Sequence, residues 1–224
     1  MEDGKIPKFS IEDVTPDIYD EVLDFFEKFH FHQIYGSVIM KCLKLYDDQF
    51  ARQEYIARWR RALEENLSLV AFVENDQGGK REIVGCNIMD VVYQNKQESL
   101  STFQSPTIKK IVEDIAYAVG LVDPYKKYGV NKCLYAIGLN VDPKYRGQGL
   151  GMEILKARLD LMKAVGLKCT VTAFSGYAAQ KSALKAGYEV LSDVPYDQFK
   201  YEDGSPVYPD IECKSMLIMA KGVD

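Results

Sequence analysis

The chain has 224 residues, 47% of them hydrophobic, and a formal net charge of −5. This length and composition predict a single domain, residues 1–224, with a substantial core. Because acidic residues exceed basic ones and lysine and arginine form only short pairs, the sequence disfavours nucleic acid as a partner held by phosphate neutralisation.

The cysteines indicate a reducing compartment. They are dispersed, odd in number and form no Cys-x-x-Cys, which argues against a disulfide framework or a structural metal site: Cys42, Cys86, Cys133, Cys169 and Cys213. Residues 1–5 contain no apolar signal core, and no run of about 18 apolar residues occurs. We therefore expect a cytoplasmic protein with no membrane association and no bound metal.

Strand-like and helical patterns alternate along the chain. The predicted strands are residues 9–14, 67–74, 82–93, 133–141, 169–174, 189–191 and 213–220. The predicted helices are residues 16–30, 37–45, 50–63, 106–119, 150–165 and 177–185. Turn-forming residues 75–79 predict a hairpin between two of the strands. Helix 50–63 carries four arginines that we expect on a solvated face: Arg52, Arg58, Arg60 and Arg61.

A glycine-rich segment, Tyr145 to Gly151, lies between a predicted strand and a predicted helix. Its glycines permit positive φ and close approach of a ligand, so main-chain N–H groups can converge beside the positive end of the helix. Arg146 adds a full charge. This arrangement predicts a phosphate site; a bare strand-to-helix turn is the alternative, but it seldom needs three alternating glycines and an arginine.

Spacing excludes two common phosphate loops. A nucleotide P-loop needs Gly-x4-Gly-Lys followed by serine or threonine, and no lysine–hydroxyl pair follows these glycines. A dinucleotide loop needs Gly-x-Gly-x-x-Gly, but Met152 occupies the third glycine position and Gly151 comes one residue early. The ligand is therefore a phosphate compound of another kind.

The segment resembles the pyrophosphate loop of the GCN5-related N-acetyltransferases, Arg/Gln-x-x-Gly-x-Gly/Ala, through Arg146, Gly149 and Gly151. The order of elements is similar to that α/β fold over nearly the whole chain, which implies a central twisted mixed sheet of about seven strands flanked by helices. The resemblance implies acetyl-CoA as cofactor and, as in many family members, a monomer. The expected cofactor-binding residues are Leu139, Asn140, Val141, Arg146, Gly147, Gln148, Gly149, Leu150, Gly151, Ser175 and Lys181.

Three further segments, residues 140–149, 185–188 and 201–207, are similar to the insect arylalkylamine N-acetyltransferases. This likeness implies direct transfer of acetyl to the primary amine of a small arylalkylamine such as dopamine, serotonin or tyramine. It places three aromatic residues on the substrate side: Phe31, Tyr35 and Phe174. The alternatives are acetylation of polyamines or other amines, a protein N-acetyltransferase, and a non-catalytic CoA-binding module.

The sequence departs from these relatives where they carry their general base. Their Asp-Glu-Pro-Leu motif corresponds to residues 33–36, so the glutamate position is Ile34, which cannot accept a proton. Of two serines in the relatives, Ser175 matches the first, whereas the second falls on Ala178 or Ala179. The proton route of the dopamine enzymes is therefore not preserved as a set.

A substitute acceptor is needed because an arylalkylamine, with a pKa of about 10, is mostly protonated at neutral pH. His30 and His32 have a suitable unperturbed pKa, near 6.5, although both can simply end and pack a helix. Tyr135 can hold a water, and Ser175 can handle a proton, touch the cofactor or cap a helix. Glu12 is a weaker candidate, since a carboxylate on a first strand commonly faces solvent.

Two other roles follow from the resemblance. A main-chain N–H between Leu139 and Val141 is expected to polarise the thioester carbonyl. Lys181 and Lys185 are expected either to reach the CoA phosphates or to lie on a solvated helix face.

Overall fold

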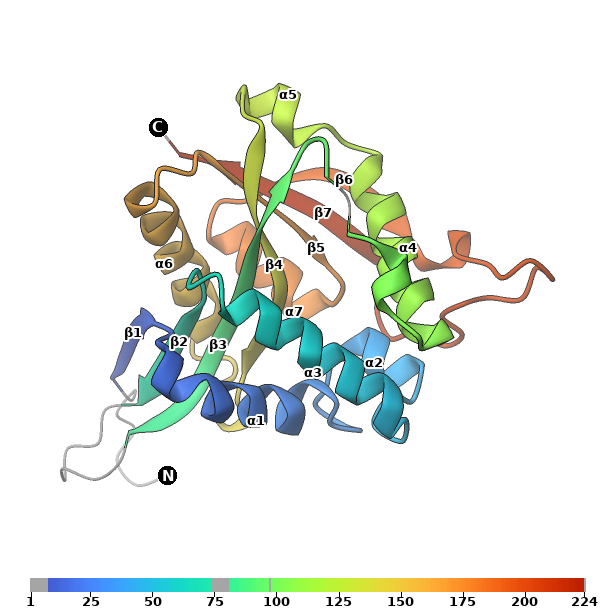
Figure 1. Ribbon diagram of the computed structural model, residues 1–224, viewed down its shortest axis with the longest axis horizontal. Coiled ribbons are helices and arrows are strands. Elements are labelled where there is room, and N and C mark those ends of the chain that lie inside the picture. The colour runs from blue at the N-terminus through green and yellow to red at the C-terminus, as the bar shows by residue number, and fades with distance from the viewer. Residues whose placement is uncertain (1–7, 74–80, 97, 224) are drawn as a thin grey trace.

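A seven-stranded mixed sheet forms the centre of the computed structural model, which describes residues 8–73, 81–96 and 98–223 (Figure 1). The strand order is β1-β2-β3-β4-β5-β7-β6. The strands are β1 (Phe9–Asp13), β2 (Leu69–Val73), β3 (Glu82–Tyr93), β4 (Lys132–Val141), β5 (Cys169–Phe174), β6 (Glu189–Pro195) and β7 (Ser215–Gly222). This sheet and its flanking helices confirm the predicted fold class.

Seven α-helices are present among the described residues: α1 (Tyr19–His30), α2 (Val38–Cys42), α3 (Gln49–Leu63), α4 (Pro106–Gly120), α5 (Pro124–Tyr128), α6 (Leu150–Ala164) and α7 (Tyr177–Lys185). Short 3-10 turns cover Pro16–Ile18, Leu100–Thr102, Pro143–Tyr145 and Tyr196–Gln198. Helix α5 was not predicted, because five residues are too few for a periodic pattern. The Asp123 side chain accepts a hydrogen bond from Lys126 N, and left-handed Gly129 ends the helix.

Pairing with a neighbouring strand, more than local composition, determines where a strand ends. Strand β6 begins at residues 189–191 as predicted and continues to Pro195, because residues 192–195 pair with β7. Strands β2 and β3 form the predicted antiparallel pair, whereas the predicted turn at 75–79 lies outside the described residues.

Helices cover both faces of the sheet (Figure 1). Alternation along β4 shows the two sides: Tyr135 packs into the core that contains residues of α1, α3 and α4, whereas Leu134 packs with Met162 of α6. Helix α7 packs beside α6 and against β5. The N-termini of α6 and α7 therefore meet the carboxyl ends of β4 and β5 on the same face.

One arginine of α3 contradicts the predicted solvated face. Arg58 is buried, and its guanidinium donates to both carboxylate oxygens of Glu98, Nε to Oε1 at 2.9 Å and Nη2 to Oε2 at 2.6 Å. The segment after β3 returns over α3 and covers this side chain. A guanidinium can be buried when a carboxylate accepts two hydrogen bonds from it. The apolar spacing of the helix does not indicate such a partner, because the partner lies elsewhere in the chain.

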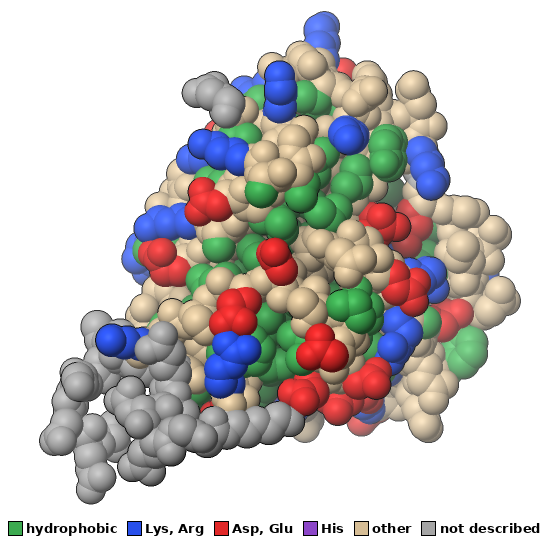
Figure 2. Space-filling view, turned by 60° about the vertical axis from the view of Figure 1, so that its left-hand side comes forward, with side chains coloured by type: hydrophobic (Ala, Val, Ile, Leu, Met, Phe, Trp, Pro, Cys, Tyr) green, Lys and Arg blue, Asp and Glu red, His purple; other side chains and the backbone are tan. Residues whose placement is uncertain are grey.

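Charged side chains of both signs are interspersed on the face shown in Figure 2. Within the described residues, no helix has both the length and the apolar character needed to cross a membrane. The same residues contain no group of three or more His, Cys, Asp or Glu side chains arranged to hold a metal ion.

A bulge in β4 opens the sheet. Met89 pairs with Ala136 and Ile88 with Gly138, so Ile137 is an extra residue that bends the strand. Strand β4 then pairs with β5 only at Leu134–Thr170 and Tyr135–Val171. The later residues of β4 consequently present an edge to the gap between the two strands.

Candidate functional site

A cleft of about 710 Å³ lies where β4 and β5 diverge. The ends of these strands form its sides, the first residues of α6 and α7 form its base, and the segment 34–38 borders its mouth. The bulge in β4 is the structural cause of the cleft, because strands that stayed paired would leave no space between them.

The glycine segment forms a nest of main-chain N–H groups. Gly147 and Gly149 have φ values of 78° and 86°, which glycine adopts without strain. Among the described residues no acceptor pairs with the N–H groups of residues 147–151, and four of these five residues line the cleft. Together with the N-terminus of the 15-residue helix α6, five free donors make an anion site.

The cleft lining is strongly cationic. Its described residues include one carboxylate, Glu212, and five positively charged side chains: Lys41, Arg146, Arg158, Lys181 and Lys185. A polyanionic ligand that extends from the glycine segment towards α7 matches this distribution.

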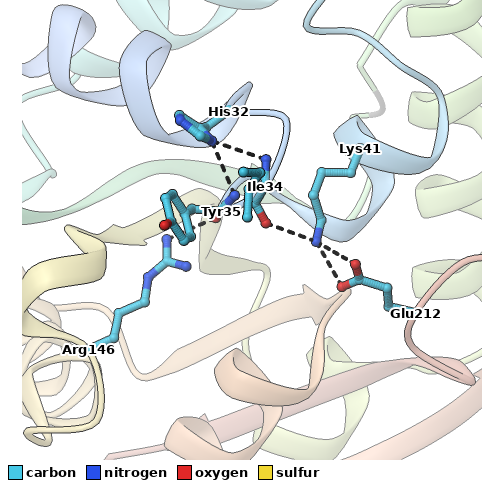
Figure 3. A network of polar contacts seen from close by, with 6 residues as sticks. All are labelled: His32, Ile34, Tyr35, Lys41, Arg146 and Glu212. Carbon is cyan, nitrogen blue, oxygen red and sulfur yellow. Dashed lines mark hydrogen bonds and ion pairs between the residues drawn. The ribbon is translucent and has the colours of Figure 1, made fainter.

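Arg146 connects the glycine segment to the mouth of the cleft. Its Nε donates to Val141 O at 2.8 Å and its Nη2 donates to Tyr35 O at 3.0 Å (Figure 3). Partial burial lowers the pKa of this guanidinium below its ordinary value. Arg146 therefore holds the segment around Tyr35 against the end of β4 as well as adding charge beside the nest.

Arg158 of α6 is fully buried at the apex of the strand divergence. Its Nη2 donates to Leu134 O at 3.1 Å and to Thr172 Oγ1 at 2.9 Å, so it links β4 to β5 where their own pairing ends. Burial lowers the pKa of this guanidinium as well.

His30 lines the cleft from the end of α1, inside a cluster of aromatic rings. Asn140 Nδ2 lies 3.2 Å from His30 Nδ1. Because an amide nitrogen only donates, Nδ1 is the acceptor and the ring hydrogen sits on Nε2. Burial lowers the pKa of His30 to about 4. The ring is thus neutral at physiological pH and has no free lone pair for a substrate proton.

Acidification should destabilise the protein through His30. The unfolded chain takes up a proton as the pH falls below the ordinary pKa of 6.5, whereas the folded protein does so only near 4, so stability is lost across this interval. The expected loss between pH 7 and pH 4.5 is about 2 kcal/mol. Urea denaturation of the parent and of His30→Phe at both pH values measures it as the difference in pH dependence.

Identical pH dependence in the parent and in His30→Phe would contradict the assignment to His30.

The other predicted histidine, His32, lies outside the cleft lining. Its Nδ1 accepts from Ile34 N at 3.1 Å and Tyr35 N at 3.3 Å, so its side chain shapes a turn (Figure 3). This turn is tight at Gly36, where an added Cβ would lie 2.4 Å from His32 O. The turn exposes Ile34, at 66%, at the mouth of the cleft.

The remaining predicted residues divide into two groups. Those lining the cleft are Tyr35, Leu139, Asn140, Val141, Arg146, Gly147, Gly149, Leu150, Gly151, Phe174, Ser175 and Lys181. Three others lie outside it. Phe31 packs against Trp59 and Tyr55, the Gln148 side chain donates to Lys144 O, and Tyr135 faces the core on the α3 side. Burial raises the pKa of Tyr135 to about 12, which keeps its phenol protonated.

Three charged residues of the cleft escaped the sequence analysis: Lys41, Arg158 and Glu212. Lys41 and Glu212 are 171 positions apart, so no local motif joins them. Arg158 follows an ordinary amphipathic pattern, and only its complete burial distinguishes it.

The model of the acetyltransferase (GNAT) family matches residues 19–188. Among curated proteins, none matches the chain significantly.

Solved structures resemble the chain along nearly its whole length. A mosquito protein from Aedes aegypti, provisionally named arylalkylamine N-acetyltransferase 7, is 31% identical, with 96% of this chain and 88% of that chain covered and a TM-score of 0.86. Arylalkylamine N-acetyltransferase 2 of the same mosquito is 19% identical (97% and 100% covered, TM-score 0.81). A Drosophila melanogaster polyamine N-acetyltransferase that forms N-acetylagmatine is 13% identical (96% and 100% covered, TM-score 0.78). The last two show likeness of fold.

Proposed function

Because the chain belongs to the acetyltransferase (GNAT) family, we propose that it transfers the acetyl group of acetyl-CoA to the primary amine of a small arylalkylamine. The observation that carries the proposal is the nest of five free N–H groups at the start of α6, inside a cationic cleft. The mosquito protein that is 31% identical over 96% of the chain supports the arylalkylamine class.

The residues present fit acetyl-CoA. A diphosphate matches the N–H groups of residues 147–151 and the charge of Arg146, and Lys181 and Lys185 lie along the same cleft for further phosphate charge. The edge that β4 presents after Ala136 can pair with the amide groups of a pantetheine arm. Bound acetyl-CoA supplies the acetyl group as a thioester.

The chain's own contribution is orientation and charge stabilisation. We assign a main-chain N–H between Leu139 and Val141 to the carbonyl oxygen on which negative charge develops, since these residues line the cleft beside the nest. The side chain of Asn140 donates a hydrogen bond to His30, and this contact fixes this part of β4. Tyr35 and Phe174 are the aromatic residues we assign to the aryl group of the substrate.

None of the cysteines is placed for an acyl-enzyme. Four of the five are buried, and none of the five lines the cleft. Burial raises the pKa of the Cys86 thiol, the opposite of what a nucleophile needs. This supports direct attack by the amine.

Steady-state kinetics with acetyl-CoA and a panel of arylalkylamines, polyamines and lysine peptides test the proposal through release of the CoA thiol. We expect the largest kcat/KM for an arylalkylamine such as tyramine, dopamine or serotonin. Preference for agmatine or another polyamine would move the substrate class towards that of the Drosophila relative. Thiol release no greater than hydrolysis with every amine would contradict catalysis and leave a CoA-binding module.

A further inference from the structure

Among the described residues, the cleft is lined by one negatively charged side chain, and its position suggests how the missing family glutamate is replaced. Among the described residues that line the cleft, Glu212 is the sole carboxylate. It belongs to the connection between β6 and β7, a segment far in sequence from Ile34.

Lys41 joins Glu212 to the turn that contains Ile34. Both carboxylate oxygens of Glu212 lie 2.8 Å from Lys41 Nζ, and the same nitrogen donates to Ile34 O at 3.3 Å (Figure 3). One lysine thus connects the carboxylate to the residue that occupies the family's glutamate position. Glu212 and the turn residues Ile34 and Tyr35 all line the same cleft.

Three further hydrogen bonds fix the Glu212 segment beside β5. Lys214 N donates to Tyr177 Oη at 3.1 Å at the start of α7, and Tyr196 Oη donates to Ser175 O at 2.9 Å while Tyr196 N donates to Lys214 O. The segment therefore lies against the carboxyl end of β5, one side of the strand divergence. Phe174 and Ser175 at this end of β5 line the cleft, as Glu212 does.

Exposure distinguishes the two partners of the ion pair. The side chain of Lys41 is 16% exposed, whereas that of Glu212 is 67% exposed. Lys41 is the anchored partner, and Glu212 keeps accessible lone pairs after accepting from it, because a carboxylate has about four acceptor positions. Because Glu212 is mostly exposed, water screens this ion pair and its contribution to stability is small.

We propose that Glu212 is the catalytic carboxylate of this protein, which binds the substrate ammonium group and accepts its proton directly or through one water. This inference rests on the proposed function. His30 does not compete for the role, because its Nδ1 already accepts from Asn140. Lys41 is a positioning residue that holds Glu212 towards the cleft.

The proton balance is complete. The ammonium group gives one proton to Glu212, which later returns it to solvent. The neutral nitrogen forms its bond to the acetyl carbon as the carbon–sulfur bond breaks, and a second proton leaves the nitrogen for the CoA sulfur. The products are the N-acetylated amine, CoA thiol and one released proton, and no further reactant is needed.

The test compares Glu212→Gln with the parent on two substrates: the amine of the panel that the parent acetylates fastest, and its β,β-difluoro analogue. The fluorines reduce the basicity of the amine, so a large neutral fraction is present at neutral pH. We expect kcat/KM to fall about 100-fold for the ordinary amine and less than about 10-fold for the analogue. Calorimetric titration of the ordinary amine into CoA-saturated protein should show affinity about tenfold weaker.

Matched variants separate the carboxylate from the ion pair. Glu202→Gln removes an exposed carboxylate of the same connection that does not line the cleft, and it should leave both substrates unchanged. Lys41→Met breaks the ion pair but keeps Glu212, and Glu212→Asp keeps a carboxylate. Both should lose less activity than Glu212→Gln.

Three results would overturn the assignment: unchanged kinetics in Glu212→Gln, an equal loss with both amines, or an equal loss in Lys41→Met and Glu212→Gln. Each of these leaves the proposed acetyltransferase function intact. Absence of turnover by the parent with every amine would instead overturn the proposed function and the role of Glu212 with it.

Discussion

Replacement of Gly149 by alanine should weaken CoA binding about tenfold. Gly149 has a φ of 86°, and a Cβ at this position would meet no atom within 4 Å, so conformation rather than crowding limits the substitution. An L-residue in left-handed backbone costs about 1–2 kcal/mol, and relief of that strain rotates the adjacent peptide groups. The N–H groups of residues 147–151 would then no longer converge. Calorimetric titration with CoA measures the loss.

Gly151 provides the matched control within the same motif. It lies in the first turn of α6, its φ is not positive, and an added Cβ would lie 3.4 Å from Ser182 Oγ, an ordinary contact. Gly151→Ala should therefore keep the CoA affinity within about twofold and stabilise the helix by up to about 1 kcal/mol. Equal CoA affinity in both variants, without loss of stability in Gly149→Ala, would contradict the role given to the left-handed glycine.

Replacement of Trp59 by alanine should cost about 3–5 kcal/mol of the free energy of unfolding. Trp59 of α3 is fully buried, and its ring centroid lies 4.9 Å from that of Phe26 and 5.1 Å from those of His30 and Tyr55. Such a loss is a large fraction of the stability of an ordinary domain. Chemical denaturation followed by far-ultraviolet circular dichroism measures it as a lower midpoint with an unchanged slope.

Phe50 is the matched control because it is an aromatic residue of the same helix and is 54% exposed. Phe50→Ala should change the free energy of unfolding by no more than about 0.5 kcal/mol. A change of similar size in both variants would mean that the aromatic cluster around His30 does not form the core we describe.

The sequence predicted the elements whose signal is local and repetitive. Helix α3 differs from its prediction by one residue at its start, because the apolar spacing of Tyr55, Trp59 and Leu63 continues over several turns. Helix α5 and the full length of β6 were missed. A five-residue helix has no period, and the last residues of β6 become a strand only through pairing with β7.

In the candidate site too, residues with a local sequence signal were predicted, whereas positions set by distant contacts were not. Twelve of the expected cofactor- and substrate-side residues line the cleft, since most of them belong to the contiguous stretch around the glycine segment. Phe31 and Gln148 do not, although both belong to segments that border it. Which side of a turn faces a ligand depends on contacts such as those of Phe31 with Trp59, and these contacts join distant parts of the chain.

The sequence by itself determined the family motif and the anion nest, because the φ values of Gly147 and Gly149 and the start of α6 depend on residues adjacent in the chain. Tertiary structure alone decided which charges meet. Lys41 and Glu212 come together across 171 positions, and Arg58 and Arg158 are buried by packing. Side-chain burial and ion pairing are fixed by long-range packing that no local pattern encodes, and for this reason only the folded chain reveals the carboxylate proposed to accept the proton of the amine.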